Sequence, residues 1–327
     1  MSQCVLVTGA SGFVGKQVCH YFLNHGFKVI GCGRQPEIEL CHKNFQYYSF
    51  DLKELKLHAF LLEQVDCVIH LAALAHQSLN TPAVAFYQIN TEYTKELVTL
   101  CAQYKVKRFI FLSSIKVNGE KTSDMPFNEQ QIPKPSDEYG RSKWFAEHHV
   151  QEIANEAGMA WVIIRPPLVY GQAVKANFAS LIKLVDKNIP IPFGKLCNQR
   201  SFIAIDNLCD FIFVCATNSK ADHQLFCISD GDDQSTGTLV KALQLARTGQ
   251  IKLFDFPVIL LKLLCSIAGK QNVFLRLSES LQVDITKAKQ LLNWQPKLKF
   301  EEAVRSYFQK EKAVSQESPF NVKKSAK

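Results

Sequence analysis

The first fifteen residues hold the feature that most constrains the fold, a short apolar run that breaks into a glycine-rich turn. The run CVLVT begins at Cys4 and is typical of a buried strand in a parallel sheet. Gly9, Gly12 and Gly15 follow it in G-x-x-G-x-x-G spacing, before apolar residues at helical spacing. We expect Gly9 to permit a tight turn, Gly12 to let a pyrophosphate approach and Gly15 to let helix pack on strand. Free N–H groups at the start of that helix then predict a dinucleotide site.

Strands alternate with helices along the first half of the chain. The expected strands after the first are 27–33, 45–50, 67–71, 108–112 and 160–164, and the longest expected helices are 82–104 and 137–157. Parallel strands joined through helices need right-handed crossovers. The sequence therefore predicts an α/β fold with a Rossmann-type doubly wound parallel sheet.

Beyond Gly171 the alternation is looser and predicts a smaller C-terminal α/β lobe. The expected elements are strands at 201–204 and 225–228 and helices at 206–217, 237–248, 257–268 and 300–308. The strand at 225–228 can rejoin the main sheet. We therefore predict a dinucleotide-binding domain at 1–171, a partly interleaved substrate lobe at 172–311 and a disordered tail at 312–327.

One stretch of this lobe, 254–268, is apolar apart from a few residues that include Lys262. We expect it to pack within the lobe, because apolar helices are usually buried. A helix lying on a membrane surface is the alternative.

Composition excludes several classes of protein. With 47% hydrophobic and 21% charged residues among 327, the chain has the composition of a globular protein. We expect no secretory leader, since Met1 to Cys4 lead straight into the first strand, and no apolar stretch reaches membrane-spanning length. Eleven cysteines without a C-x-x-C pair fit a cytoplasmic protein and suggest no metal site. The net charge of +8 comes without a basic, aromatic-rich block, so it predicts attraction of an anionic ligand and no nucleic-acid binding.

Three side chains have the types and positions needed for proton transfer. Tyr139 and Lys143 are four residues apart on an expected helix, so they share one face. A phenol ordinarily has a pKa of about 10, which a neighbouring ammonium and an oxidised nicotinamide would both lower. Ser114 follows an expected strand, where its hydroxyl can orient a reacting oxygen. This arrangement predicts interconversion of an alcohol and a ketone.

Five motifs together resemble the extended short-chain dehydrogenase/reductases. They are TGASGFVG at 8–15, HLAA at 70–73, SSIKVNGE at 113–120, YGRSK at 139–143 and RPPLVYG at 165–171. Within that class the chain resembles the nucleotide-sugar epimerase/dehydratase family, typified by UDP-glucose 4-epimerase, from residue 4 to about 308. The resemblance implies a UDP-sugar substrate, a nicotinamide cofactor and a homodimer formed by the helices at 82–104 and 137–157.

The resemblance also implies roles for individual residues. The implied catalytic residues are Ser114, Tyr139 and Lys143, the spacing to the tyrosine favouring Ser114 over Ser113. The implied cofactor contacts, besides this tyrosine and lysine, are Gly9, Ser11, Gly12, Phe13, Val14, Gly15, Arg34, Asp51, Leu52, Leu71, Ala72, Ala73, Asn90, Pro166 and Val169. The implied substrate contacts are Ser114, Lys116, Asn177, Arg200 and Arg276. An always-charged guanidinium suits a diphosphate, although a surface ion pair is the alternative for Arg276.

Three positions depart from the family pattern. Ile115 and Lys116 replace the Asp-Glu pair of related dehydratases, which argues against elimination of water. Asn118 replaces an aromatic residue and is expected to alter the sugar pocket. Arg34 replaces the aspartate that in NAD-using relatives binds the ribose 2′-hydroxyl. Since an arginine attracts a 2′-phosphate, the sequence favours NADP(H), with NAD(H) as the alternative.

These inferences predict a cytoplasmic enzyme that transfers hydride at C4 of a UDP-sugar. Residues 113–120 and 276–284 look most like bacterial enzymes for N-acetylated amino-sugars of surface polysaccharides. We favour a 4-ketoreductase of a UDP-4-keto-6-deoxy-N-acetylhexosamine. A 4-epimerase of UDP-glucose or UDP-N-acetylglucosamine is the first alternative, and a non-catalytic NADP-binding redox sensor is a remote one.

Overall fold

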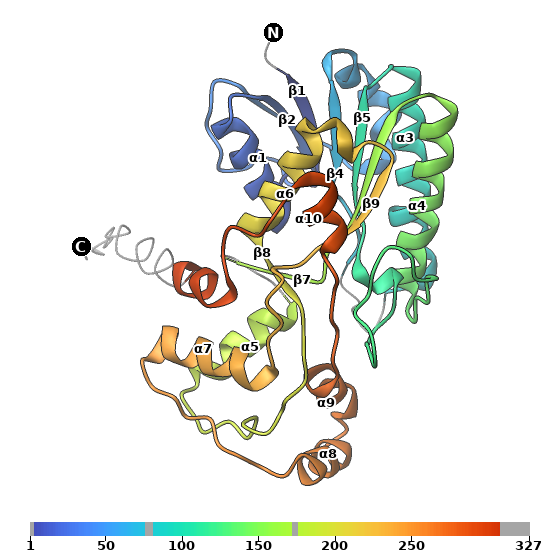
Figure 1. Ribbon diagram of the computed structural model, residues 1–327. Coiled ribbons are helices and arrows are strands. Elements are labelled where there is room, and N and C mark those ends of the chain that lie inside the picture. Colours follow the sequence, from blue (N-terminus) through green and yellow to red (C-terminus); the bar gives the residue numbers. More distant parts are fainter. Residues whose placement is uncertain (1–2, 76–80, 172–175, 308–327) are drawn as a thin grey trace, which may run out of the picture.

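The computed structural model describes residues 3–75, 81–171 and 176–307. A large sheet with helices on both faces forms the upper part of the molecule in Figure 1, and a smaller lobe lies below it. Within the described residues, none of the helices combines the length and apolar character needed to cross a membrane.

The main sheet has seven parallel strands in the order β3-β2-β1-β4-β5-β6-β9. The strands are β1 (Cys4–Thr8), β2 (Lys28–Gly33), β3 (Phe45–Ser49), β4 (Cys67–His70), β5 (Arg108–Leu112), β6 (Ala160–Arg165) and β9 (Gln224–Cys227). The order reverses between β1 and β4, and ligands bind at such a switch point outside the carboxyl ends of the strands. The predicted doubly wound α/β fold is confirmed, as is the return of the strand near residue 225 to the main sheet.

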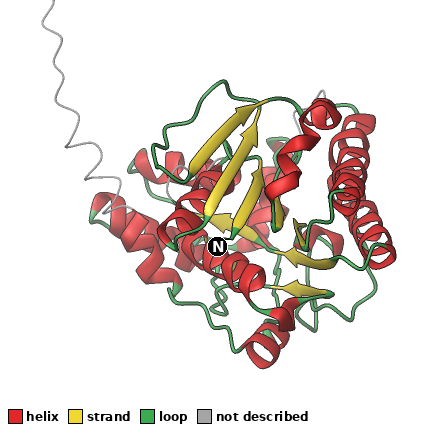
Figure 2. Ribbon diagram, turned by 90° about the horizontal axis from the view of Figure 1, so that it is seen from above, coloured by secondary structure: helices red, strands yellow, loops and turns green. Residues whose placement is uncertain are grey.

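Two helical layers cover the sheet (Figures 1 and 2). Alternate residues of each strand face opposite layers, so Ile110 contributes to one core and Phe109 and Phe111 to the other. One layer consists of α1 (Phe13–Asn24) and α6 (Ile205–Thr217). The other consists of the 3₁₀ helix η1 (Leu52–Gln64), α3 (Tyr93–Gln103) and α4 (Glu138–Glu156).

The helix expected at 82–104 is interrupted by a turn of π-helix. It consists of α2 (Ala83–Phe86), η2 (Tyr87–Glu92), which is the π-helical part, and α3. A π-helical turn contains more residues than an α-helical turn and shifts the positions that face inward. Here it buries Asn90 and Thr91 against α4, where Thr91 Oγ1 donates a hydrogen bond to the Ser142 carbonyl at 2.8 Å.

The smaller lobe surrounds a separate core. A parallel pair of short strands joins it to the sheet, and residues 300–307 add a further helix. Its named elements are β7 (Leu168–Tyr170), β8 (Phe202–Ala204), α5 (Ala176–Asp186), α7 (Thr236–Thr248), α8 (Val258–Ile267) and α9 (Gln271–Ser278). Helix α10 (Thr286–Leu292) packs on the main sheet beside β9, and the short helices η3 (Ile115–Val117) and η4 (Ser219–Ala221) also lie outside the lobe. The sequence did not predict β7, because it is three residues long and directly follows two prolines.

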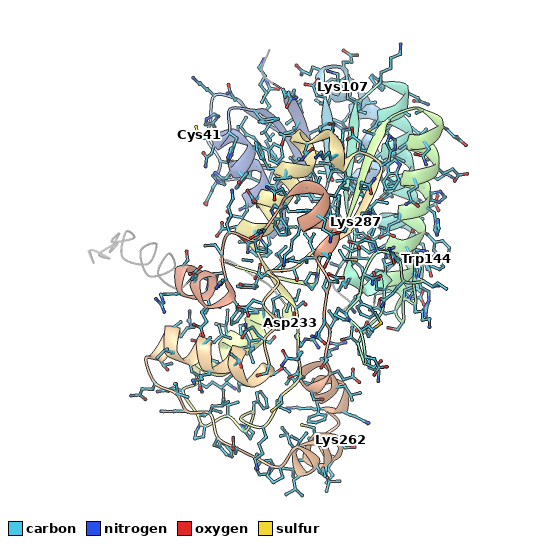
Figure 3. All side chains as sticks on the ribbon, viewed as in Figure 1. Cys41, Lys107, Trp144, Asp233, Lys262 and Lys287 are labelled. Carbon is cyan, nitrogen blue, oxygen red and sulfur yellow. The ribbon has the colours of Figure 1, made fainter. Side chains whose placement is uncertain are left out.

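The expectation that the apolar stretch at 254–268 packs within the lobe is wrong for most of its residues. It does form a helix, α8, but Leu261 is the one residue of that helix that is buried. Figure 3 shows Lys262 at the lower end of the molecule, far from the sheet. The local pattern predicted the helix correctly, while the number of neighbours around it depends on the tertiary fold.

Candidate active site

The glycine-rich turn leaves the start of α1 open to a ligand. Gly9 has a φ of +70°, a left-handed conformation that favours glycine. A Cβ atom at Gly15 would lie 2.1 Å from the Gly9 carbonyl oxygen, so the helix approaches the turn as the sequence predicts. Gly12 is the N-cap of α1 and no side chain caps the helix. The N–H groups of Phe13 and Val14 thus begin a helix whose positive end suits a pyrophosphate, and the turn fits a dinucleotide.

The end of β2 lies directly beside this turn. A Cβ atom at Gly33 would lie 2.7 Å from Ser11 Oγ. Ser11 also forms a side-chain hydrogen bond with Tyr47, whose hydroxyl donates to the Gln35 carbonyl at 2.8 Å. Arg34 comes next in the chain and is exposed. It therefore lies where the ribose of a dinucleotide bound to the turn would be expected.

A buried histidine joins β4 to the neighbouring elements. His70 Nδ1 lies 2.7 Å from Thr8 Oγ1, and its Nε2 lies 2.9 Å from Thr94 Oγ1. Thr94 donates its hydroxyl proton to the Asn90 carbonyl, so we assign the ring proton to Nε2 and the acceptor role to Nδ1. Burial and the nearby charge of Lys143 lower the pKa of His70 to about 3. His70 is consequently a neutral structural residue.

The same threonine network orders the loop after β4. The Leu71 and Ala72 N–H groups both donate to Thr8 Oγ1 at 3.2 Å, and Ala73 follows at the surface. The Asn90 amide donates to the Leu74 carbonyl and to Ser142 Oγ, and its Oδ1 accepts from the Leu74 N–H at 2.8 Å. Asn90, predicted as a cofactor contact, is thus a buried bridge between this loop and α4.

Ser114 and Tyr139 meet at the carboxyl end of β5. Ser114 is the N-cap of η3, and its Oγ accepts from the Lys116 N–H at 3.3 Å. A side-chain hydrogen bond joins Ser114 to Tyr139 in the first turn of α4. Burial raises the pKa of Tyr139 to about 12; the hydrogen bond from Ser114 opposes the rise, and the charge of Asp137 adds to it. The ligand-free protein therefore keeps this phenol protonated.

Lys143 lies one turn further along α4 and is 1% exposed. Its ammonium lies 4.2 Å from the centroid of the Phe111 ring. Burial lowers the pKa of Lys143 to about 7, and the negative charge of Glu147, one turn further on, opposes the decrease. Because its pKa is near neutrality, the protonation state of Lys143 is sensitive to any charge that binds beside it.

Glu147 belongs to a buried polar network that the sequence did not predict. Arg165 Nε and Nη2 donate to its two carboxylate oxygens at 2.9 and 2.5 Å, and Ser113 Oγ also donates to it. Arg165 Nη1 donates to Asn118 Oδ1, and the Asn118 amide donates to the Asn128 carbonyl. Asn118 was expected on the wall of the sugar pocket, but the structure places its side chain within this network. The only sequence signal for Glu147 was its position four residues after Lys143.

Lys116, which the sequence predicts as a substrate contact, is held by two carboxylates. Its ammonium contacts Asp137 Oδ2 at 2.6 Å and Glu120 Oε1 at 2.9 Å. Burial lowers the pKa of Lys116, but hydrogen bonds to the two carboxylates outweigh burial and raise the pKa above its ordinary value. Asp137 is the N-cap of α4, and its other oxygen accepts from the Gly140 N–H at 2.7 Å. Lys116 therefore holds the cap of the helix that carries Tyr139.

The lobe brings two of the three predicted sugar-diphosphate residues together. Arg200 Nη1 donates to the carbonyls of Arg276 and Glu279 at the end of α9, at 3.0 Å each. Burial lowers the pKa of Arg200, and the charges of Glu120 and Glu279 oppose that effect. Arg276 is exposed. Asn177 lies in the first turn of α5, but its side chain lies outside the described part of the structure.

Other predicted cofactor residues border the same edge of the sheet. Asp51 caps η1 by accepting from the Lys53 N–H, and Leu52 begins that helix. The Pro166 carbonyl accepts from the Ile115 N–H at 2.9 Å, which fixes the segment after Ser114, and Val169 lies in β7. Among the residues that the structure describes, no group of three acidic, histidine or cysteine side chains could hold a metal ion.

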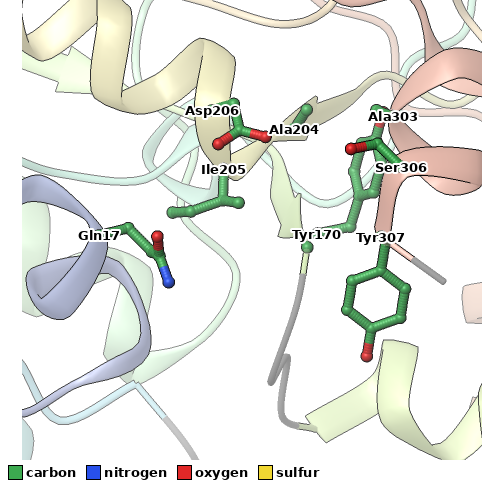
Figure 4. A pocket seen from close by; sticks show the side chains of 9 residues that line it. Gln17, Tyr170, Ala204, Ile205, Asp206, Ala303, Ser306 and Tyr307 are labelled. Carbon is green, nitrogen blue, oxygen red and sulfur yellow. The ribbon is translucent and has the colours of Figure 1, made fainter. Parts of the chain in front are cut away.

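A hollow outside this region contains none of the predicted catalytic residues. Gln17 of α1, Asp206 of α6 and Tyr307 of the last described helix border it, along with Tyr170 (Figure 4). Ser114, Tyr139 and Lys143 are not among its lining residues. The candidate active site lies instead at the carboxyl ends of β4 and β5, where these three side chains are found.

The short-chain dehydrogenase/reductase class is defined by two features that this structure has. One is a glycine-rich turn that fits a dinucleotide, and the other is a serine, a tyrosine and a lysine beside it at the carboxyl edge of a parallel sheet. A model of the NAD dependent epimerase/dehydratase family matches residues 5–228. The chain belongs to this family and is an NAD(P)-dependent enzyme of the epimerase or dehydratase type, which confirms the predicted resemblance.

Individual relatives support this assignment. The chain is 36% identical over 301 residues to a UDP-glucose 4-epimerase of Vibrio cholerae, and the match covers 90% of this chain and 92% of that protein. Its fold is similar to that of a UDP-glucose 4-epimerase of Thermotoga maritima solved with UDP-glucose, with a TM-score of 0.78, 22% identity and coverage of 96% and 100%. A UDP-glucuronic acid 4-epimerase of Bacillus cereus in complex with NAD is also similar, with a TM-score of 0.77, 24% identity and coverage of 95% and 99%.

Proposed function

We propose that this protein transfers hydride at C4 of a UDP-sugar and that it is a 4-epimerase. The hydrogen-bonded pair of Ser114 and Tyr139, one helical turn from buried Lys143, carries the proposal of alcohol–ketone chemistry. The similarity to the Vibrio cholerae UDP-glucose 4-epimerase over most of both chains supports C4 as the position and epimerisation as the outcome.

In this proposal Tyr139 moves the proton and Ser114 orients the sugar oxygen. The phenol of Tyr139 is protonated in the ligand-free protein, so it can donate to a C4 ketone as it stands. In the opposite direction it must first lose its proton, which the ammonium of Lys143 favours. A nicotinamide, when bound, supplies and accepts the hydride. The phosphates of that cofactor would contact the N–H groups at the start of α1, where Gly12 leaves the helix uncapped.

The UDP part of the substrate would bind to the smaller lobe. The Arg200 guanidinium contacts the backbone carbonyl of Arg276 near the end of α9, so the two arginines are neighbours, and a diphosphate is a ligand that guanidinium groups bind well. Glu120 lies near Arg200 and is paired with Lys116, so the lobe and the sheet meet beside Tyr139. We propose that the diphosphate lies against the arginines while the sugar reaches Ser114.

A 4-ketoreductase that consumes NADPH is the second candidate, and Arg34 favours it. Arg34 is exposed beside the glycine turn, where its charge would attract a 2′-phosphate. Such a reductase would act on a UDP-4-keto-6-deoxy-N-acetylhexosamine. The Arg34→Asp variant tests this cofactor preference, because it replaces attraction with repulsion and should move the preference from NADPH toward NADH. Equal cofactor preference before and after the change would show that Arg34 does not contact the ribose.

Two further proposals concern the assembly and location of the protein. We propose a homodimer in the cytoplasm that forms through α3 and α4, near which the large apolar side chains of Phe145 and Tyr104 are exposed. Light scattering at micromolar concentration tests the dimer, and a monomer there would contradict it.

The deciding experiment separates epimerisation from reduction. The protein is given UDP-glucose or UDP-N-acetylglucosamine without added reductant, and separately a UDP-4-keto-6-deoxy-N-acetylhexosamine with NADPH. The C4 epimer in the first mixture, with no loss of nicotinamide absorbance in the second, supports the epimerase. Loss of NADPH in the second, with no epimer in the first, supports the reductase. Activity in neither mixture would contradict both candidates.

A further inference from the structure

Helix α8 exposes an apolar face that the proposed reaction does not use. Ile259, Leu263 and Ile267 are spaced four residues apart, so they form one stripe, and these side chains are 82%, 55% and 77% exposed. Leu260 and Leu264 continue the stripe and are also exposed. On the other side of the helix Leu261 is buried in the core of the lobe, and the partly buried Val258 and Cys265 pack against the same core. A helix that is apolar on nearly every side is ordinarily covered by something.

The exposed apolar residues cluster in this part of the molecule. Among the described residues, eight of the large apolar side chains that are exposed fall between Ile251 and Val273. Figure 1 shows α8 and α9 at the end of the molecule that is remote from the sheet. The helices expected to form the dimer, α3 and α4, lie against the sheet instead, so a dimer through them would leave this face uncovered.

Cationic side chains border the same face. From Lys252 to Ser278 the sequence contains four cationic residues and one acidic residue, Asp255. Lys262 and Lys270 are exposed, and in the described part of the chain neither takes part in an ion pair. A second copy of the chain on this face would bring like charges together, whereas an anionic surface would meet opposite charge.

We propose that the apolar face of α8 and its flanking lysines bind the surface of an anionic lipid bilayer. The stripe of Ile259, Leu263 and Ile267 enters the boundary between headgroups and acyl chains, while Lys262 and Lys270 contact the lipid phosphates. The helix has ten residues and lies in the plane of the surface. The active site then faces a water-soluble substrate while the enzyme is held beside the membrane, which goes beyond the proposed function and does not depend on it.

The test is flotation of the full-length protein with lipid vesicles. Wild-type protein should float with vesicles of phosphatidylcholine and phosphatidylglycerol and much less with vesicles of phosphatidylcholine alone. The triple variant Ile259→Ser, Leu263→Ser, Ile267→Ser should bind the anionic vesicles about tenfold more weakly or worse. The matched control, Leu57→Ser, Met125→Ser, Ile132→Ser, removes three exposed apolar side chains from other parts of the surface and should bind as wild type.

Three results would overturn the proposal. They are no flotation of wild type with anionic vesicles, equal flotation with both kinds of vesicle, and unchanged flotation of the α8 variant. Analytical ultracentrifugation of the same proteins tests whether a second copy of the chain covers this face instead. A smaller assembly in the α8 variant, together with no vesicle binding by wild type, would assign the face to a second copy. If the triple variant does not fold, Lys262→Glu with Lys270→Glu replaces it, and it should lose binding to anionic vesicles. Activity of each variant on a soluble UDP-sugar should remain at the wild-type level.

Discussion

The charged side chains around Tyr139 and the two arginines of the smaller lobe, Arg200 and Arg276, are held in opposite ways. At the edge of the sheet charges are buried and paired, as in Glu147 with Arg165, or are clamped between two partners, as in Lys116. In the lobe, Arg200 donates to backbone carbonyls and Arg276 is exposed. The difference indicates that the groups around Tyr139 are fixed in position, as proton transfer requires, while the exposed charge of Arg276 fits the diphosphate site proposed above.

The largest effect on turnover is expected from removing the proton donor at the edge of the sheet. Tyr139→Phe should reduce turnover by about two to four orders of magnitude, because the phenol proton has no substitute. Cofactor affinity, measured by fluorescence titration, should change little. Tyr104→Phe removes a hydroxyl from a partly exposed tyrosine at the end of α3 and should leave turnover unchanged. Near-normal turnover of Tyr139→Phe would exclude this residue as the acid.

The next effect concerns the stability of the buried pair. Arg165→Met leaves the carboxylate of Glu147 buried without its cation and should lower the free energy of unfolding by about 3–5 kcal/mol. Urea denaturation measures this change. The control, Lys107→Met, breaks an ion pair whose lysine is largely exposed and should cost less than about 1 kcal/mol. Similar losses in the two variants would contradict the contrast between buried and exposed charge.

In the lobe the expected effect is on substrate binding. Arg276→Met should raise KM for a UDP-sugar by about tenfold with kcat retained, because a charged hydrogen bond to phosphate is lost. Lys241→Met, at an exposed position of α7, is the control and should leave KM unchanged. A fall in kcat without a change in KM would place the role of Arg276 in the chemical step.

The smallest effect separates the charge of Asp137 from its role as a helix cap. Asparagine is as good an N-cap as aspartate, so Asp137→Asn should preserve α4. The charge of Asp137 raises the pKa of Tyr139, and its removal should lower that pKa. The pH profile for alcohol oxidation should then move toward lower pH, by up to about one unit. Asp124→Asn, an exposed control, should not move it, and a shift of the Asp137→Asn profile to higher pH would contradict the assignment.

The sequence predicted what depends on local spacing. The turn at Gly9 and Gly15 follows from residues within one strand, turn and helix, and Lys143 follows Tyr139 by one helical turn. The fold class followed from the order of strands and helices.

The rest depended on residues that are distant in the chain. Asn118 bonds Arg165, which is 47 positions away, and Lys116 bonds Asp137, which is 21 positions away. The sequence gives no distance between such residues before the fold is known. The exposure of α8 was missed for the same reason, because an apolar pattern is the same in a covered helix and an uncovered one.

The neutral state of His70 has a consequence for titration experiments. With a pKa of about 3, this ring keeps one proton throughout the range in which enzymes are ordinarily assayed. Its two threonine contacts therefore stay the same while the rate is measured at successive pH values. A plot of rate against pH is then free of an imidazole inflection from this residue, whereas Lys143, whose pKa burial lowers to about 7, changes its charge within that range. Observation of the His70 ring by NMR would supply an internal reference that does not titrate.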